Sequence, residues 1–391
     1  MRDRDAHGRE PSRDVGLFRV KVPASSANLG PGFDSVGLAL SFALEVEVFP
    51  DTAWRFVPLS PGLEEVPRDE TNLVIATALA AAAERGVVLP PCRLEARSNI
   101  PLARGLGSSA SAIVAGLLIA DELGGLGLGR DELARLAARA EGHPDNALAA
   151  VYGGLVVAAS EGDGHGDGHG DGHGDDRGDG RRDGRDGADR DAAGPPPFVR
   201  AELPPCDIVL CIPDYVLETK KARAALPPAL PFGRAVTVSA RANVLVAALL
   251  AGDWCKAGRM MGADLFHEPF RRPLLPDLDR MRLLAYENGA YGAALSGAGP
   301  SVIAFTPPGR GSELRETWAR AFPAFEARLA LPDTEGALRL PSRRAGGAGK
   351  TCADGELYDS AAPAAPAAPA APAAPAAPAA PAASVSMTSP R

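Results

Sequence analysis

Apolar and polar residues alternate near the start of the chain in two runs that are typical of β-strands. Leu17–Val22 alternates and ends at Pro23, and a longer strand pattern covers Val36–Phe49. A turn-rich stretch, ASSANLGPGFD, separates the two runs. Asp69–Arg85 is rich in helix formers and is closed by Gly86, so it predicts a helix.

The pattern of apolar and polar residues predicts five further elements before residue 160. The patterns predict a strand at Arg93–Arg97, a loop at Pro101–Gly107, an almost wholly apolar helix at Ser108–Leu123, an amphipathic helix at Arg130–Glu141, and a run into a buried strand over Ala147–Ala159. Strands and helices are therefore mixed in this part of the chain.

The last third of the chain carries a second set of elements. Strands are predicted at Asp207–Ile212, Ala293–Leu295 and Val302–Phe305, and helices at Thr219–Ala225, Val236–Leu250, Leu278–Asn288 and Glu313–Phe322. The order lacks the regular alternation of a doubly wound parallel sheet. We therefore expect an α+β protein with an N-terminal domain over residues 17–204 and a C-terminal domain over residues 205–345.

Three segments are predicted to stay outside these domains. Residues 1–16 carry four acids and four bases and almost nothing apolar. Residues 161–197 are built largely from Gly, Asp, His and Arg, and residues 346–391 include seven Ala-Ala-Pro repeats. None of them carries enough apolar surface to offset the entropy of ordering it. About 300 residues remain, which is enough for two domains that share an interface. We expect that removing most of the insert and the tail leaves catalysis nearly unchanged.

The net charge of −8 is concentrated in the insert, because Glu161–Asp191 contains eleven acids and five arginines, a net of −6. The remaining −2 leaves the domains nearly neutral, which argues against nucleic-acid binding. Five cysteines without a C-x-x-C pair fit a reducing compartment. We find no signal peptide and no apolar run near the roughly 18 residues of a membrane helix. These features predict a cytoplasmic protein without a membrane partner.

The octet Arg104–Ser111 (RGLGSSAS) is the most informative short motif in the chain. Two glycines allow a tight turn, and small hydroxylated residues open the following helix. A helix start presents free N–H groups and a positive dipole, both of which suit a polyphosphate. The alternative is a tight turn in which the Ser108 hydroxyl caps the helix. A loose match to a dinucleotide fingerprint fails because no strand precedes it and no strand-ending acid follows about 20 residues later.

Two other glycine-rich loops need separate interpretations. Gly346–Thr351 (GGAGKT) ends like a Walker loop, but Arg344 stands where its first glycine is required, so we reject it. Ser296–Ser301 (SGAGPS) joins two short apolar strands, and on its own it predicts a hairpin turn. Its significance depends on the other motifs.

Taken in order, Val22–Asp34 (VPASSANLGPGFD), Pro101–Ser111 (PLARGLGSSAS) and Leu295–Ser301 (LSGAGPS) resemble the three-motif signature of the GHMP small-molecule kinases. Together with the first motif, Glu141–Asn146 (EGHPDN) resembles the homoserine kinases among them. The resemblance spans roughly residues 17 to 340. It implies an N-terminal domain like ribosomal protein S5 domain 2, a ferredoxin-like C-terminal domain, and phosphoryl transfer from ATP to the side-chain hydroxyl of L-homoserine in threonine biosynthesis.

The resemblance implies an ATP and Mg²⁺ site at the second motif. The residues implied to bind the nucleotide are Pro101, Leu102, Ala103, Arg104, Gly105, Leu106, Gly107, Ser108, Ser109, Ala110 and Ser111. Mg²⁺ prefers oxygen ligands, and the hydroxyl of Ser109 and the carboxylate of Glu141 match the family's metal positions. An acid near a helix C-terminus, as Glu141 is expected to be, is unfavourably placed for stability, which favours a functional role.

The resemblance also implies an amino-acid site. Arginine is the usual carboxylate clamp because its planar fork binds both oxygens. Two stretches, Thr219–Arg223 and His267–Arg271, match the family's carboxylate-binding segments. The residues implied to contact the substrate are Asn28, Asp34, His143, Asn146, Thr219, Arg223, Arg271 and Gly297. Without the motifs, each arginine would be interpreted as part of a surface ion pair, and His143 as a structural hydrogen-bonding residue.

The resemblance implies three catalytic residues: Ser109, Glu141 and Asp145. In several relatives the matching aspartate pairs with a lysine near the first motif and acts as a base. Ser25–Asn28 contains no lysine, so two roles for Asp145 stay open: it acts as a base, or it only positions the hydroxyl while the γ-phosphate accepts the proton. The sequence also leaves open another GHMP kinase with a mevalonate-type substrate, a silent nucleotide-binding homologue, and a homodimer.

The insert contains His165, His169 and His173 at four-residue spacing, with aspartates between them. Such a tract can hold Zn or Ni weakly. A segment without a preformed surrounding shell is more typical of a solvated loop, which is the interpretation we favour.

Overall fold

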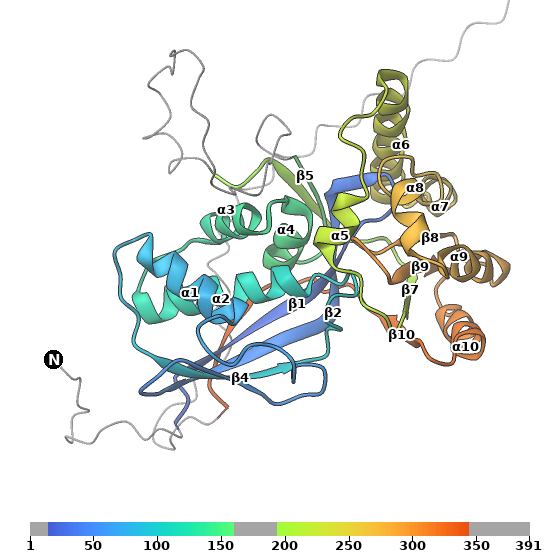
Figure 1. The fold of residues 1–391 in the computed structure, drawn as a ribbon. Helices are drawn as coiled ribbons and strands as arrows, with labels where there is room; N and C mark the ends of the chain where they lie inside the picture. Colours follow the sequence, from blue (N-terminus) through green and yellow to red (C-terminus); the bar gives the residue numbers. More distant parts are fainter. Residues whose placement is uncertain (1–14, 160–193, 344–391) are drawn as a thin grey trace, which may run out of the picture. The chain divides into compact units, whose positions relative to one another are not determined.

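The structure is a computed structural model, and it describes residues 15–159 and 194–343 (Figure 1). Most of the leader, of the insert and of the Ala-Ala-Pro tail lies outside the described residues. The same holds for the histidine tract and for the Walker-like segment that starts at Gly346. The four motifs of the resemblance all lie within the described ranges.

The first sheet is built from the two long strands that the alternating pattern predicts. β1 (Phe18–Asn28) and β2 (Gly32–Pro50) pair antiparallel, and the order along the sheet is β11-β1-β2-β4-β3. The other strands are β3 (Arg55–Pro58), β4 (Cys92–Ser98), β5 (Leu155–Ala158), β6 (Phe198–Ala201) and β11 (Leu338–Pro341). β5 pairs with β2, and β6 pairs with β5.

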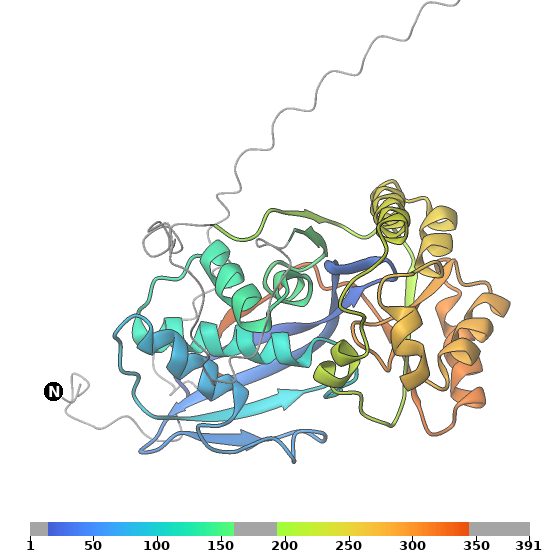
Figure 2. The ribbon, with the colours of Figure 1, turned by 45° about the horizontal axis from the view of Figure 1, so that its top comes forward.

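Four helices lie on one side of this sheet (Figures 1 and 2). They are α1 (Leu73–Ala83), α2 (Ser108–Gly124), α3 (Arg130–Glu141) and α4 (Pro144–Tyr152). α2 and α4 pack on the strands of the sheet, α1 packs on α2, and α3 packs on α2 and α4. α2 is the central one, and eleven of its residues are buried, from Ala110 to Asp121. Burial on nearly all sides explains why its sequence is apolar all round rather than along one stripe.

The second sheet is antiparallel, with the order β10-β7-β9-β8. Its strands are β7 (Asp207–Ile212), β8 (Gly292–Leu295), β9 (Val302–Thr306) and β10 (Glu326–Ala330). α9 (Leu278–Glu287) and α10 (Gly311–Ala321) pack on it, and fully buried Trp318 lies in their shared core. The remaining helices are α5 (Thr219–Ala224), α6 (Phe232–Leu250), α7 (Trp254–Met261), α8 (Glu268–Arg271) and the short η1 (Arg272–Leu274).

The predicted α+β class is confirmed, but two of the predicted elements are wrong in kind or extent. β1 does not end at Pro23: it continues to Asn28, and a register shift directly after Pro23 accommodates a residue without an N–H. The run over Ala147–Ala159 is mostly helix α4, followed by short strand β5. Pro144 at the first helical turn starts that helix, because proline has no N–H to lose there.

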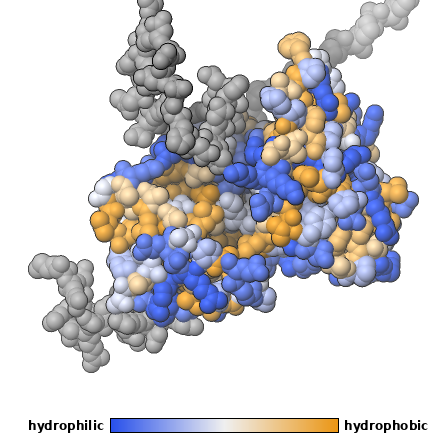
Figure 3. Space-filling view, viewed as in Figure 1, coloured by the Kyte–Doolittle hydropathy of each residue, from blue (hydrophilic) through white to orange (hydrophobic). Residues whose placement is uncertain are grey.

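Helix α6 differs from the expectation that no segment approaches a membrane helix, because by length and composition it is long and apolar enough to cross a membrane. It contains Arg234 and Arg241, whose side chains donate hydrogen bonds to the carbonyls of Leu265 and Ala263. It packs on α7. The exposed apolar residues of this helix are Phe232, Val236, Val244 and Leu250. Figure 3 shows orange areas at the upper right, where α6 lies in the same view of Figure 1.

The two sheets do not divide the chain at a single point. β11 comes last in the described chain, yet it pairs antiparallel with β1, with Phe18 opposite Pro341. The chain therefore returns to the first sheet after completing the second. The predicted boundary at residues 204 and 205 falls between β6 of the first sheet and β7 of the second.

Candidate active site

Helix α2 begins at the predicted octet, and its first N–H groups are not capped by a side chain. Gly107 is the N-cap residue, in the left-handed region with φ of 69°, and no side chain of the described residues accepts a hydrogen bond from the helix start. The Cβ of any other residue at 107 would lie 2.1 Å from the Ser25 Oγ. The alternative of a Ser108 cap is therefore not realised, and the N–H groups face the site.

The three glycine- and serine-containing motifs are tied to one another by hydrogen bonds. Ser296 donates from its Oγ to the Gly105 carbonyl at 2.7 Å and lies 2.8 Å from the Ser26 Oγ. The Gly297 N–H donates to the Ala27 carbonyl at 3.0 Å. Motifs that are about 190 residues apart in the chain thus form one continuous wall.

Asn28 lies at the end of β1 in a left-handed conformation, with φ of 74°. Its Nδ2 donates to the Gly297 carbonyl at 2.9 Å, and its Oδ1 accepts from the Asp34 N–H at 3.0 Å. Asp34 itself has φ of 52°. Such conformations are uncommon outside glycine and persist where surrounding contacts enforce them. The Asn28 amide therefore shapes the turn that presents the Asp34 carboxylate.

An acid and a hydroxyl meet at the start of α2. The Ser109 Oγ donates to the Glu141 Oε2 at 3.0 Å, and Glu141 is the last residue of α3. Gly142 follows in the left-handed region and ends the helix. Burial raises the pKa of the Glu141 carboxyl above its ordinary value, although His143 and the Ser109 hydrogen bond counteract it. A cation placed here would relieve the cost of that burial.

The start of α4 presents a histidine, an aspartate and an asparagine. The His143 Nδ1 lies 2.6 Å from the Asp145 Oδ1, which also accepts the Asn146 N–H at 2.7 Å. The Ser25 Oγ donates to the Asn146 Oδ1 at 2.9 Å. Burial alone would lower the pKa of His143, but Asp145, Glu141 and Asp34 together raise it. The Asp145 carboxylate is almost fully buried.

Helix α4 can approach β2 this closely because residue 37 has no side chain. A Cβ at Gly37 would lie 2.1 Å from the Asp145 carbonyl oxygen. The glycine therefore sets the position of the whole polar helix start.

Two arginines form the opposite end of the site. Arg223, on α5, makes a bidentate ion pair with Asp34 at 2.8 and 3.1 Å. Arg271, on α8, donates to the Gly297 carbonyl at 3.2 Å and to the Ala222 carbonyl at 3.3 Å. Both guanidinium groups lie over the Phe33 ring, at 5.7 and 5.3 Å from its centre. Burial and the nearby Arg223 lower the pKa of Arg271 to about 10.

These groups line one cavity. All eight residues predicted to contact the substrate and all three predicted catalytic residues are among its walls. The predicted nucleotide residues that reach it are Ala103, Gly105, Gly107, Ser108 and Ser109. The Arg104 guanidinium points elsewhere, to the carbonyls of Pro213 and Asp214 at 2.8 and 2.7 Å. None of the residues lining this cavity in the described chain is a lysine.

A second cavity, of about 240 Å³, lies on the other side of the helix start. It shares Ser108 and Ser109 with the first, and it is otherwise mostly apolar, with Leu44, Phe56, Leu63, Val66, Leu73, Ile100, Leu102 and Ala112 in its walls. Leu102, Ser108 and Ser109 in its walls belong to the predicted nucleotide motif, but the other wall residues come from segments without a motif, so the sequence analysis did not predict this cavity.

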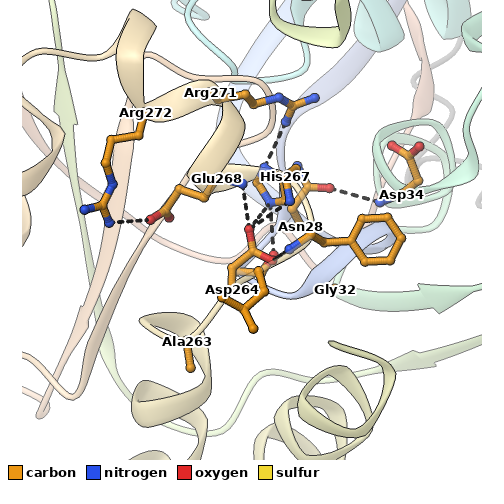
Figure 4. Close-up of polar contacts among 12 residues, drawn as sticks. Asn28, Gly32, Asp34, Ala263, Asp264, His267, Glu268, Arg271 and Arg272 are labelled. Atoms are coloured by element: carbon orange, nitrogen blue, oxygen red, sulfur yellow. Dashed lines mark hydrogen bonds and ion pairs between the residues drawn. The ribbon is translucent and has the colours of Figure 1, made fainter. Parts of the chain in front are cut away.

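The structure also adds site residues that the sequence analysis did not select. Phe33 lies in the first motif and His267 in the stretch His267–Arg271. These two stretches alone could therefore have identified both residues. Asp264, which contacts His267, lies outside every motif (Figure 4). Only the fold brings it to the site.

Comparisons with known proteins agree with this architecture. The GHMP kinases N terminal domain matches residues 72–154, and the GHMP kinases C terminal domain matches residues 245–324. The homoserine kinase of Bacillus licheniformis is 43% identical over 319 residues, which cover 81% of this chain and 94% of that protein. The homoserine kinase of Shouchella clausii is 42% identical over 320 residues, covering 82% and 97%.

A solved structure extends the similarity to three dimensions. The crystal structure of homoserine kinase from Cytophaga hutchinsonii superposes with a TM-score of 0.66 at 25% identity, covering 85% of this chain and 99% of that one. The two-domain fold predicted from the motifs is thereby confirmed. With two family domains matched and relatives above 40% identity along four fifths of its length, the chain belongs to the GHMP kinases, and within them to the homoserine kinases.

Proposed function

We propose that this protein transfers the γ-phosphoryl group of ATP to the side-chain hydroxyl of L-homoserine, forming O-phospho-L-homoserine for threonine biosynthesis. The observation that carries the proposal is the single cavity in which an uncapped helix start, Glu141 and Asp145 face two arginines and Asp34. A zwitterionic amino acid with a hydroxyl and a polyphosphate are the two ligands that such a set of charges suits.

The start of α2 is the proposed phosphate site, because its N–H groups and dipole attract anions. The second cavity shares Ser108 and Ser109 with this helix start and is lined mainly by apolar residues, so it is the proposed site of the adenine base. ATP would then lie across Ser108 and Ser109, with its base in one cavity and its γ-phosphate in the other.

Mg²⁺ fits between Ser109 and Glu141. Both offer oxygen atoms, their oxygens are already 3.0 Å apart, and burial makes the Glu141 charge costly without a cation. A bound Mg²⁺ would neutralise charge on the phosphates. Asp34, His143 and Asp145 also have ligand atoms within 4.8 Å of one another, but Asp34 is paired with Arg223, and His143 with Asp145. The oxygen pair at α2 is therefore the better match.

Homoserine would replace one ion pair by two. In the structure Asp34 neutralises Arg223. A bound amino acid offers its ammonium to Asp34 and its carboxylate to Arg223 and Arg271, so both charges of the pair keep a partner. Thr219, near Arg223 on α5, also lines the cavity. Mevalonate has no ammonium group, so it would leave Asp34 without a partner.

Asp145 and Asn146 would orient the hydroxyl for in-line attack on the γ-phosphorus. The Asp145 Oδ1 already accepts two hydrogen bonds, so its Oδ2 is the oxygen proposed to accept the substrate hydroxyl. As the new O–P bond forms, the bond from the γ-phosphorus to the bridging oxygen breaks and ADP leaves. The hydroxyl proton passes either to Asp145 or to an oxygen of the transferred phosphoryl group. No lysine among the described cavity residues assists Asp145.

We extend the proposal to the organisation of the protein. The N-terminal domain over residues 17–204 would supply the nucleotide side and the domain over residues 205–345 the carboxylate side. A cytoplasmic location completes the proposal, and the oligomeric state stays open between a monomer and a homodimer.

The test is an ADP-release assay with ATP and Mg²⁺ on homoserine, threonine, serine and mevalonate in parallel. We expect turnover with homoserine well above that with the other three. Faster turnover of mevalonate would assign the chain to another GHMP kinase activity. Tight ATP binding without turnover of any alcohol would instead indicate a silent nucleotide-binding homologue.

A further inference from the structure

His267 is a fully buried histidine that contacts the proposed carboxylate clamp but does not line the substrate cavity. Its Nδ1 lies 3.0 Å from the Arg271 Nη1, and its Nε2 lies 3.0 Å from the Gly30 carbonyl oxygen (Figure 4). Gly30 belongs to the first motif and Arg271 to α8, so this one ring joins segments that are 241 residues apart. His267 has no role in the proposed phosphoryl transfer.

The two partners determine the tautomer of the ring. An arginine N–H can only donate, so the His267 Nδ1 must carry a lone pair. A carbonyl can only accept, so the Nε2 must carry the hydrogen. A doubly protonated ring would direct an N–H at the Arg271 N–H and place two positive charges side by side. The observed geometry therefore requires neutral His267.

The other groups around the ring fit this state. Asp264 Oδ2 lies 3.5 Å from the Nε2, Glu268 is nearby, and the Phe33 ring stacks on the imidazole at 5.1 Å between centres. Burial, the largest influence, lowers the pKa of His267, and the charge of Arg271 lowers it further, while Asp264, the hydrogen bond to Gly30 and Glu268 raise it. The net direction is towards the neutral ring.

The backbone that carries His267 is itself fixed. The Asp264 carboxylate accepts the N–H groups of Phe266, His267 and Glu268 at 2.6, 3.2 and 2.7 Å (Figure 4). These bonds satisfy the free N–H groups ahead of α8. The ring consequently has little freedom to turn away from Arg271.

Arg271 is left without an acidic partner among the described residues. Its neighbour in the same segment, Glu268, forms an ion pair with Arg282 instead. The hydrogen-bond partners of Arg271 are the His267 ring and two backbone carbonyls, all of them neutral. A buried guanidinium that is held by neutral acceptors keeps its charge for a ligand.

We propose that His267 is a positioning residue for substrate recognition: its neutral Nε2–H form holds Arg271 at the carboxylate site and ties it to the Gly30 turn of the first motif. The inference rests on the proposed function, in which Arg271 binds the homoserine carboxylate. It predicts that the acceptor at Nδ1, rather than the bulk of the ring, determines homoserine affinity.

Two amide substitutions separate the acceptor at Nδ1 from the bulk of the ring. The amide oxygen of His267→Asn can occupy the position of Nδ1 and keep the acceptor for Arg271, whereas the amide of His267→Gln reaches the position of Nε2 and keeps only the bond to Gly30. We expect His267→Gln to raise the homoserine KM about ten-fold, in line with the loss of a hydrogen bond to a charged group. His267→Asn should stay within about three-fold of the natural protein. The ATP KM should stay constant in both.

A purely structural role predicts a different pattern, with equal losses in the two variants or with the ATP KM rising alongside the homoserine KM. Either result overturns the inference, as does an unchanged homoserine KM in both variants. Arg271→Leu, measured in the same series, tests the proposed function separately. If it raises the homoserine KM while His267→Gln does not, only the role of His267 fails.

A measurement on the natural protein covers the case in which neither variant folds. Nitrogen-15 NMR of histidine-labelled enzyme distinguishes a protonated from an unprotonated ring nitrogen. His267 should show an unprotonated Nδ1 and a protonated Nε2 from about pH 6 to about pH 8, where an ordinary histidine titrates. A ring that titrates in this range, or that carries its hydrogen on Nδ1, would exclude the proposed role.

Discussion

The two ends of the substrate cavity are assembled in different ways. At the proposed nucleotide end, Ser109 and Glu141 come from α2 and α3, which pack on each other within one layer of helices. At the proposed amino-acid end, Asp34, Arg223 and Arg271 come from three separate segments. Asn28 holds Asp34 from within the first segment, and His267 holds Arg271 from within the third. One end depends on a local helix junction, and the other on contacts between distant parts of the chain.

The charged side chains at the two ends also differ in which neighbouring groups neutralise or hydrogen-bond them. Glu141 is partly buried and accepts a hydrogen bond from the Ser109 hydroxyl, and burial raises the pKa of its carboxyl more than His143 and Ser109 lower it. The arginines at the other end are already bound, Arg223 to Asp34 and Arg271 to neutral acceptors. The nucleotide end is thus prepared to receive a cation, whereas the amino-acid end must exchange partners when its ligand binds. Substitutions at the two ends should therefore change different kinetic constants.

The largest effect is expected from Glu141→Gln, which removes the charge but keeps the shape of the side chain. We expect kcat to fall by about a hundred-fold or more, because the proposed Mg²⁺ would lose an anionic ligand. Homoserine affinity, measured by calorimetry, should change little. Glu132→Gln on the same helix is the matched control, since Glu132 pairs with Arg85 outside the cavity. Weakened homoserine binding with normal kcat would move Glu141 to the amino-acid end.

Arg271→Leu should act at the opposite end. Loss of a charge-assisted pair costs about 1.5–3 kcal/mol, so the homoserine KM should rise roughly ten- to a hundred-fold with a nearly constant ATP KM. A smaller loss of kcat is also expected, because the carboxylate anchor helps to align the hydroxyl.

Arg272→Leu provides the control for this substitution. Arg272 is adjacent in sequence, but its guanidinium pairs with Glu268 and Asp279 and lies outside the cavity. Its replacement should leave both KM values nearly unchanged. If Arg271→Leu raises the ATP KM as much as the homoserine KM, the assignment of the second domain to the amino acid is wrong.

The contrast between the two ends also explains what the sequence could predict. The helix start at Ser108, the end of α3 at Glu141 and the strand Asp207–Ile212 follow from local patterns, and the structure places them at the predicted residues. The nucleotide end depends on such local features. The helix boundaries could therefore be predicted locally, but the octet alone left a phosphate loop and a capped turn open, and only the resemblance implied the role of Glu141.

The amino-acid end could be predicted only through the family motifs. No periodicity indicates that Arg223 meets Asp34 across 189 residues, or that Asp264 fixes the segment that carries His267. The direction of the Arg104 side chain could likewise not be predicted, because its acceptors are backbone carbonyls in a distant loop. The continuation of β1 past Pro23 depends on a register shift, which is a property of the paired strands.

A smaller effect is expected when the pH is changed, because the His143–Asp145 pair between the two ends makes the stability of the protein depend on pH. The pKa of His143 is raised in the folded protein above the ordinary value of 6.5. The protonated form is therefore favoured by folding, and its stabilisation is fully present below the unfolded pKa and is lost as the pH rises through the folded pKa. Urea denaturation of the natural protein and of His143→Gln should differ more at about pH 5.5 than at about pH 8.5. A difference that grows with pH would contradict the assigned direction.

The smallest effect is expected from removing a segment that belongs to neither end. Ala158 of β5 lies directly opposite Phe198 of β6, so the two strands that flank the insert are already adjacent in the sheet. Deleting residues 162–187 leaves residues 159–161 and 188–197 as the connection, and the entropy of closing a loop changes only slowly with its length. With the chain also truncated after Ser360, we expect kcat and both KM values within about three-fold of the full-length protein. If turnover collapses while the circular dichroism spectrum and the melting temperature stay normal, the insert contributes directly to the site, and the two-ended description of the cavity is incomplete.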